Sequence, residues 1–170
     1  DDSESRGLGD VYKRQKVGFM KDVVNLVSNL SFFQNPTDIV PINGGITNVN
    51  VSVTDGDKKY VVRIGNDIPE HGVMRWNELA LSKAAESLGV SPAVIHFEPG
   101  ILVLEFIEAQ TFKEADVRAP KNLMRVISLV AKTHRGIGKY LNTPILTFWP
   151  FQVNQSYMLR LESDGSPHIS

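Results

Sequence analysis

The sequence predicts an α+β fold, in which about five antiparallel strands and one inserted helix form a small lobe that is followed by further helices. Residues 49–64 alternate apolar and polar side chains around an Asp-Gly pair, a pattern typical of a β-hairpin. Residues 73–88 and 121–137 instead carry apolar side chains three and four positions apart, which indicates helices. Residues 101–107 form a nearly continuous apolar run, typical of a central strand buried on both faces.

The composition is that of an ordinary globular protein. The 170 residues are 42% hydrophobic and 22% charged, enough for one domain or a little more. A net charge of -1 gives no reason to expect nucleic acid or an anionic membrane as a partner, and no apolar run is long enough to span a bilayer. The absence of cysteine excludes disulfides, thiolate metal sites and a cysteine nucleophile, and fits the cytoplasmic location that we expect.

The two ends of the chain suggest a fragment. Residues 5–15, SRGLGDVYKRQ, match the peptide obtained by translating one frame of a transposon-based sequencing adapter. We therefore treat residues 1–15 as a scar outside the fold, and expect the true gene to begin upstream of Lys16. Residues 164–170 stop in a loop with no terminal element, which favours the same interpretation.

The first elements are a helix and a glycine-containing hairpin. Apolar residues recur at helical spacing in residues 16–30, and residues 39–65 predict two or three short strands. The glycines at 44 and 45 are followed by a strand, whereas a dinucleotide fingerprint or a Walker-type loop would open a helix. A strand, glycine loop and strand form the flap that covers the nucleotide in protein kinases. The alternative is a hairpin of any antiparallel sheet, because turns use glycine by default.

Two charged residues interrupt apolar patterns. Arg63 lies inside the apolar strand of residues 59–64, and Glu78 falls within an apolar row of the helix at residues 73–88. Burying a carboxylate costs several kcal/mol unless a cation or several donors meet it. A helix packed on the sheet could pair Glu78 with Arg63, as in the kinase fold. The alternative is that both side chains extend to solvent at the edge of the packing.

The second half of the chain changes character after the run at residues 101–107. We expect a strand at residues 93–97, a domain boundary near residues 108–113, and helices at residues 121–137 and 152–161. The loop between these helices carries Phe148, Trp149 and Phe151, for which the sequence favours local packing over a binding platform. The predicted organisation is a helix and linker at residues 16–36, a lobe at 37–108 and a partial helical lobe at 109–170.

Residues 38–158 resemble the choline/ethanolamine kinase branch of the aminoglycoside-phosphotransferase superfamily, and most closely its bacterial choline-kinase-like enzymes. The resemblance rests on an ordered set of segments rather than on one motif. These segments are GGITN at 44–48, YVVRIG at 60–65, the Asn77-Glu78 pair, GVSPAVIHFEPGILVLEFIE at 89–108 and WPFQVNQSYM at 149–158.

The resemblance implies a protein-kinase-like amino-terminal lobe and ATP-dependent phosphorylation of a hydroxyl on choline or a similar amino alcohol. Arg63 would take the place of the usual lysine, with Glu78 as its partner, because the planar guanidinium can bind two phosphate oxygens. A hinge of Glu105, Phe106 and Ile107 would meet adenine through its backbone. The residues that would cover the phosphates are Gly44, Gly45, Thr47 and Asn48.

The family's catalytic loop, a His-x-Asp-x-x-x-x-Asn pattern, and its later acidic metal ligand do not occur in the sequence. The sequence therefore predicts no catalytic residue and no Mg²⁺ ligand in this chain, and we expect them in a missing part. A natural pseudokinase is the alternative. The acceptor could also be an aminoglycoside, thiamine, homoserine or a ketosamine. A further alternative is that the protein is not an enzyme but a kinase-like binding module.

Overall fold

A computed structural model describes residues 20–42 and 47–165. The chain divides into two compact units. The sheet unit comprises described residues 20–42, 47–65 and 92–110, and the helical unit comprises residues 66–91 and 111–165. The sequence-based division into residues 16–36, 37–108 and 109–170 stays a prediction.

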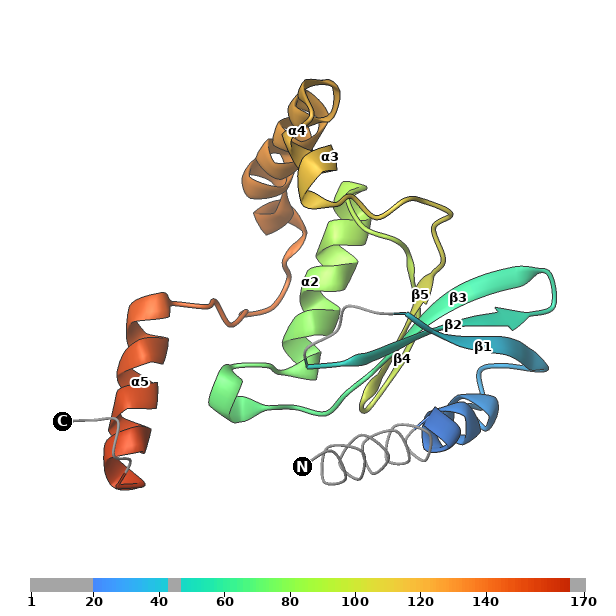
Figure 1. Cartoon of the computed structure of the whole chain (residues 1–170), viewed down its shortest axis with the longest axis horizontal. Coiled ribbons are helices and arrows are strands. Elements are labelled where there is room, and N and C mark those ends of the chain that lie inside the picture. The colour runs from blue at the N-terminus through green and yellow to red at the C-terminus, as the bar shows by residue number, and fades with distance from the viewer. Residues whose placement is uncertain (1–19, 43–46, 166–170) are drawn as a thin grey trace, which may run out of the picture. The chain divides into compact units, whose positions relative to one another are not determined.

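The sheet unit contains a five-stranded antiparallel sheet, which confirms the predicted α+β fold (Figure 1). The strands lie in the order β1-β2-β3-β5-β4, so that the apolar run at β5 is an inner strand, as predicted. Its first four residues are buried, but β5 ends at Glu105, two residues before the predicted end. The strand bounds are β1 (Pro36–Ile42), β2 (Val49–Asp55), β3 (Lys58–Ile64), β4 (Val94–Glu98) and β5 (Ile101–Glu105).

The predicted hairpin between β2 and β3 is present, but its turn consists of Gly56 and Asp57, one residue later than the predicted Asp55-Gly56 pair, because Asp55 is still paired with Lys58 in the ladder. Gly56 has a φ of 59°, which a glycine adopts without steric cost. The Asp55 carboxylate also accepts hydrogen bonds from the backbone amides of Asn35 at 2.6 Å and Gln34 at 3.1 Å. The Asp55 side chain therefore ties the segment that enters β1 to the end of β2.

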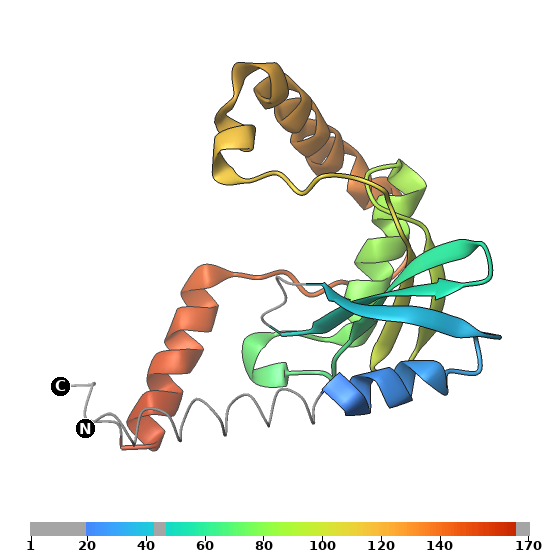
Figure 2. The ribbon, with the colours of Figure 1, turned by 45° about the vertical axis from the view of Figure 1, so that its right-hand side comes forward.

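The core of the sheet unit lies between one face of the sheet and a helix whose described part spans residues 20–28 (Figure 2). The alternation predicted for β2 and β3 is confirmed, because Val51, Val53 and Val62 all point into this core and are fully buried. The helix and the turn after it supply Val23, Val27, Leu30 and Phe33, and β5 supplies Ile101 and Val103.

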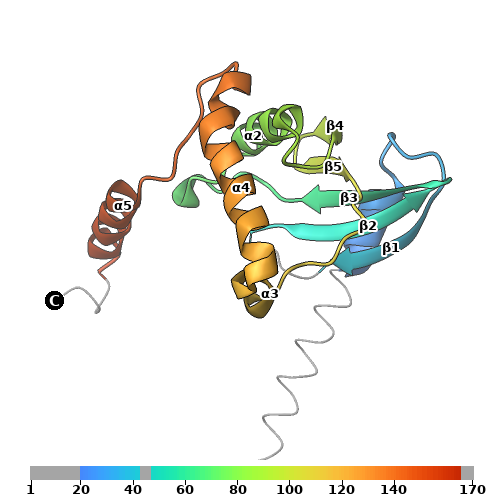
Figure 3. The same ribbon diagram turned by 90° about the horizontal axis from the view of Figure 1, so that it is seen from above.

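The helical unit contains the predicted helices and one that the sequence did not predict. This additional helix, α3 (Glu114–Arg118), has only five residues, too few for an apolar period to appear. At the C-terminal end of α2, α4 approaches closely, and a Cβ on Gly136 would lie 2.7 Å from Leu88 Cδ1 (Figure 3). The other elements are the 3-10 turns η1 (Pro69–His71) and η2 (Ile137–Tyr140) and the helices α2 (Arg75–Leu88), α4 (Pro120–Gly136) and α5 (Pro150–Ser163).

Much apolar surface of α4 and α5 is exposed. The stripe predicted along α4 includes Leu123, Ile127 and Val130, and each of these side chains is accessible to solvent. Phe148, Trp149 and Phe151 are also exposed, and the rings of Trp149 and Phe151 contact each other with centroids 5.7 Å apart. That these residues serve local packing rather than a binding platform stays a prediction. Of the helices that the structure describes, none has the length and apolar character needed to cross a bilayer.

Replacing Val62 by alanine tests the core. We expect Val62→Ala to lower the free energy of unfolding by about 2 kcal/mol, because two buried methyl groups are lost and a cavity remains. Val40→Ala, at a β1 residue that is 53% exposed, is the matched control and should change stability by less than about 0.5 kcal/mol. Urea unfolding followed by circular dichroism measures both, and equal effects would contradict the assignment of the core face.

Candidate functional site

Arg63 lies on the face of the sheet opposite the valine core. Across the ladder it pairs with Asn50 of β2 on one side and with Leu102 of β5 on the other. The Nε of Arg63 donates a hydrogen bond to Asn50 Oδ1 at 3.2 Å, and the side chain is half-buried. The sequence predicted Arg63 inside a strand but did not identify Asn50 as the residue that orients its guanidinium plane.

The last residue of the predicted glycine loop, Asn48, precedes Asn50 of β2 by two positions in the sequence. Gly44 and Gly45 lie outside the described residues, whereas Thr47 and Asn48 are described and half-buried. Because β2 and β3 pair from Val49 with Ile64, the end of the loop and Arg63 lie at the same end of the sheet. Two residues along a strand span about 7 Å. Asn48, the last of the proposed phosphate-covering residues, therefore directly precedes the strand that pairs with the proposed phosphate-binding cation.

Asn48 carries a buried acceptor. Its Oδ1 is shielded from solvent and has no hydrogen-bond partner among the described residues. An unsatisfied buried polar group costs about 1–3 kcal/mol. This oxygen therefore needs a donor at the base of the glycine loop, which a bound molecule could supply.

The predicted hinge follows β5. The backbone amide of Glu105 donates to the Ala93 carbonyl at 2.9 Å, and that of Phe106 donates to the Lys59 carbonyl at 3.2 Å. The amide of Ile107, the third hinge residue, has no such backbone partner among the described residues. Glu105 and Phe106 line a cavity of about 440 Å³, together with Lys59, whose ammonium lies 4.1 Å from the centre of the Phe106 ring.

Glu78 lies in the helical unit, in the first turn of α2. Its Oε2 accepts a hydrogen bond at 2.7 Å from Nη1 of Arg75, which is only 8% exposed. The Arg75 Nε donates to the Asn66 carbonyl at 3.0 Å, and its backbone amide donates to Asp67 Oδ1 at 2.6 Å. Arg75 therefore holds the Glu78 carboxylate in one position and favours its charged form.

The sequence analysis did not find Arg75. A cation in the first turn of a helix opposes the helix dipole, so the pattern gave no reason to expect a buried one there. The contact with Asp67 crosses a turn and joins residues eight positions apart, which no helix-capping pattern anticipates. The predicted pair of Arg63 and Glu78 joins residues of the two different units and stays a prediction.

The described residues do not offer a magnesium site. Nowhere in residues 20–42 and 47–165 do three or more His, Asp or Glu side chains gather closely enough to hold a metal ion.

The fold has a counterpart among solved structures. The chain is similar to an ethanolamine kinase from Plasmodium vivax, with a TM-score of 0.56 and 18% sequence identity over 75% of this chain. The aligned part is 37% of that kinase. The sheet unit and helices therefore have the fold of a kinase-like amino-terminal lobe with the first helices of a second lobe. No protein-family model matches the sequence, and no curated protein matches it either.

The ion pair at the start of α2 can be tested by mutation. Arg75→Ala removes a donor from both Glu78 and the Asn66 carbonyl, and we expect it to lower the free energy of unfolding by about 2–3 kcal/mol. Arg118→Ala removes the Arg–Glu pair of α3, whose two side chains are both exposed, and should cost less than about 0.5 kcal/mol. Thermal unfolding measures both variants. Equal melting temperatures would contradict the conclusion that the Arg75 contacts stabilise the fold more than the exposed pair of α3 does.

Proposed function

We propose that this chain is the nucleotide-binding part of an ATP-dependent kinase that phosphorylates a hydroxyl of choline or a similar amino alcohol. The observation that carries the proposal is the pairing of β2 with β3, which brings the end of the glycine loop and the Asn50-oriented Arg63 to the same end of the sheet. The similarity in fold to an ethanolamine kinase supports it.

Each proposed residue has a physical role. The amides of the loop at Gly44 and Gly45 would cover the phosphates, and Thr47 and Asn48 would close the base of the loop. Arg63 would bind two phosphate oxygens with its planar fork, which the hydrogen bond to Asn50 orients in advance. Preorganisation of this kind strengthens binding because less side-chain freedom is lost when the ligand arrives.

The backbone hydrogen bonds already made by the hinge residues limit how adenine can be held. The amides of Glu105 and Phe106 already serve the sheet, so the amide of Ile107 is the donor that we assign to the adenine ring. Backbone recognition would leave the side chains of the hinge free to vary, and Ile107 is indeed exposed.

The proposal assigns nucleotide binding, and not catalysis, to these residues. Phosphoryl transfer needs a group that orients the attacking hydroxyl and charges that neutralise the transferred phosphoryl group. Glu78, held by Arg75, would keep the phosphate-binding arginine in place. The sequence contains no His-x-Asp-x-x-x-x-Asn pattern, so we assign no base to it.

Calorimetric titration with ATP and magnesium tests the proposal. We expect saturable binding that weakens about tenfold or more, equivalent to about 1.4 kcal/mol, in Arg63→Ala, because a cation beside the phosphates is lost. Adenosine binding should stay unchanged in the same variant, since it has no phosphate. Arg135→Ala, at an exposed arginine of α4, is the matched control.

Two results would refute the proposal. One is the absence of saturable ATP binding by the folded chain. The other is equal ATP affinity in the unmodified chain and in Arg63→Ala, with circular dichroism verifying that the variant is folded.

A further inference from the structure

Two cavities of the helical unit share a set of polar residues. The larger has a volume of about 650 Å³ and the smaller about 570 Å³, and His71, Tyr157 and Arg160 line both. These volumes fall in the range of small-molecule sites. Of the described residues proposed above for nucleotide binding, none lines either cavity.

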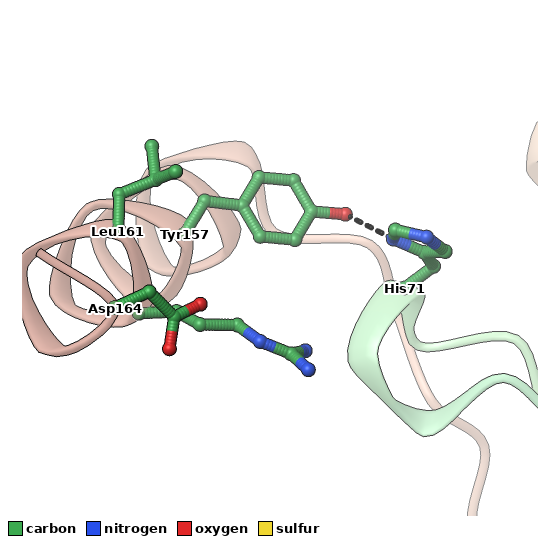
Figure 4. A pocket seen from close by; sticks show the side chains of 5 residues that line it. His71, Tyr157, Leu161 and Asp164 are labelled. Carbon is green, nitrogen blue, oxygen red and sulfur yellow. Dashed lines mark hydrogen bonds between the residues drawn. The ribbon is translucent and has the colours of Figure 1, made fainter. Parts of the chain in front are cut away.

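The walls of the cavities are fixed by hydrogen bonds between segments distant in the sequence. His71 Nδ1 and the Tyr157 hydroxyl are 2.8 Å apart, and Figure 4 shows Tyr157 pointing from α5 toward His71. Asn77 of α2 makes two hydrogen bonds to the backbone of Leu146, one from its Nδ2 at 3.1 Å and one to its Oδ1 at 2.9 Å. These bonds join η1 to the middle of α5, and α2 to the loop that precedes α5.

The polar groups favour an anion. Among the residues that the structure describes, no carboxylate forms an ion pair with the Arg160 guanidinium. His71 uses Nδ1 for Tyr157, which leaves Nε2 for a second partner. The one acidic residue lining the smaller cavity in the described chain is Asp164, which follows Arg160 by four residues at the end of α5. A planar guanidinium matches the geometry of a carboxylate or a phosphate group.

The larger cavity adds an aromatic wall. Phe148 is 70% exposed and Trp149 is 60% exposed, so two large apolar side chains remain open to solvent at its edge. Leu81, Leu146 and Val153 complete the apolar lining. Exposed aromatic surface beside an unpaired cation suits a ligand that has both a ring and a negative charge. A cationic ligand such as an amino alcohol would be repelled by Arg160.

We propose that these cavities form a second ligand site, which binds a small organic anion made of an aromatic ring and a carboxylate or phosphate group. Arg160 and His71 bind the anionic group, and Phe148 and Trp149 contact the ring. The site is independent of the nucleotide function proposed above, because it uses none of the described residues assigned to ATP.

Fluorescence titration with phenyl phosphate tests the site. The chain has two tryptophans, so Trp76→Phe leaves Trp149 as the only one, and its emission reports on the aromatic wall. We expect a saturable change, an affinity that falls at high salt, and at least tenfold weaker binding in the Trp76→Phe, Arg160→Gln double variant. Arg135→Gln in the same background is the matched control and should bind as tightly as Trp76→Phe alone.

Further measurements separate the parts of the proposal. Inorganic phosphate and benzyl alcohol supply the anion alone and the ring alone, and each should bind at least tenfold more weakly than phenyl phosphate. Arg63→Ala should leave the affinity for phenyl phosphate unchanged, because Arg63 lines neither cavity. The proposal is overturned if phenyl phosphate gives no saturable signal, if Arg160→Gln binds it with unchanged affinity, or if inorganic phosphate binds equally well.

Discussion

The alternation of side chains along β2 and β3 is the constraint on which the sheet unit depends. One set of alternate residues, which includes Val51, Val53 and Val62, is buried against the amino-terminal helix. The other set is thereby forced to the opposite face, where Asn50 and Arg63 meet. A shift of one residue in the pairing would exchange the two sets, so the hydrophobic core and the position of Arg63 are specified together.

The helical unit uses a different principle, in which buried polar groups fix local geometry. Arg75 is nearly inaccessible to solvent; its side chain donates hydrogen bonds to oxygens of Glu78 and Asn66, and its backbone amide donates to Asp67. Such a cluster is stabilising only when it is complete, because a buried charge that loses its partner is costly. The Glu78 carboxylate at the start of α2 is therefore held on a rigid part of the helix.

Much of the fold could be predicted from the sequence because it depends on local periodicity. The β2–β3 hairpin, the inner strand β5 and the helices α2 and α4 all follow from patterns within one segment. What the sequence could not supply are contacts between distant segments. Asp67 reaches the amide of Arg75, and Asn77 reaches Leu146, and no spacing rule links these pairs. Asn50 and Arg63 do follow a rule, because the position of the hairpin turn sets their pairing, but the turn lies one residue after the predicted position. The exposure of the aromatic residues in the 143–151 segment could not be predicted for the same reason, since exposure is set by what packs on a loop.

The two arginines proposed as ligand contacts differ in a way that bears on what each could do. Arg63 is half-buried and is oriented by a strand neighbour, so its fork is held at the end of the sheet where β2 begins. Arg160 is exposed on a helix, where it can follow a ligand but must first lose the freedom of a long side chain. A fixed cation suits a site that must hold phosphates in register with other groups, as phosphoryl transfer requires. A mobile cation beside an aromatic wall suits reversible binding, in which only affinity matters.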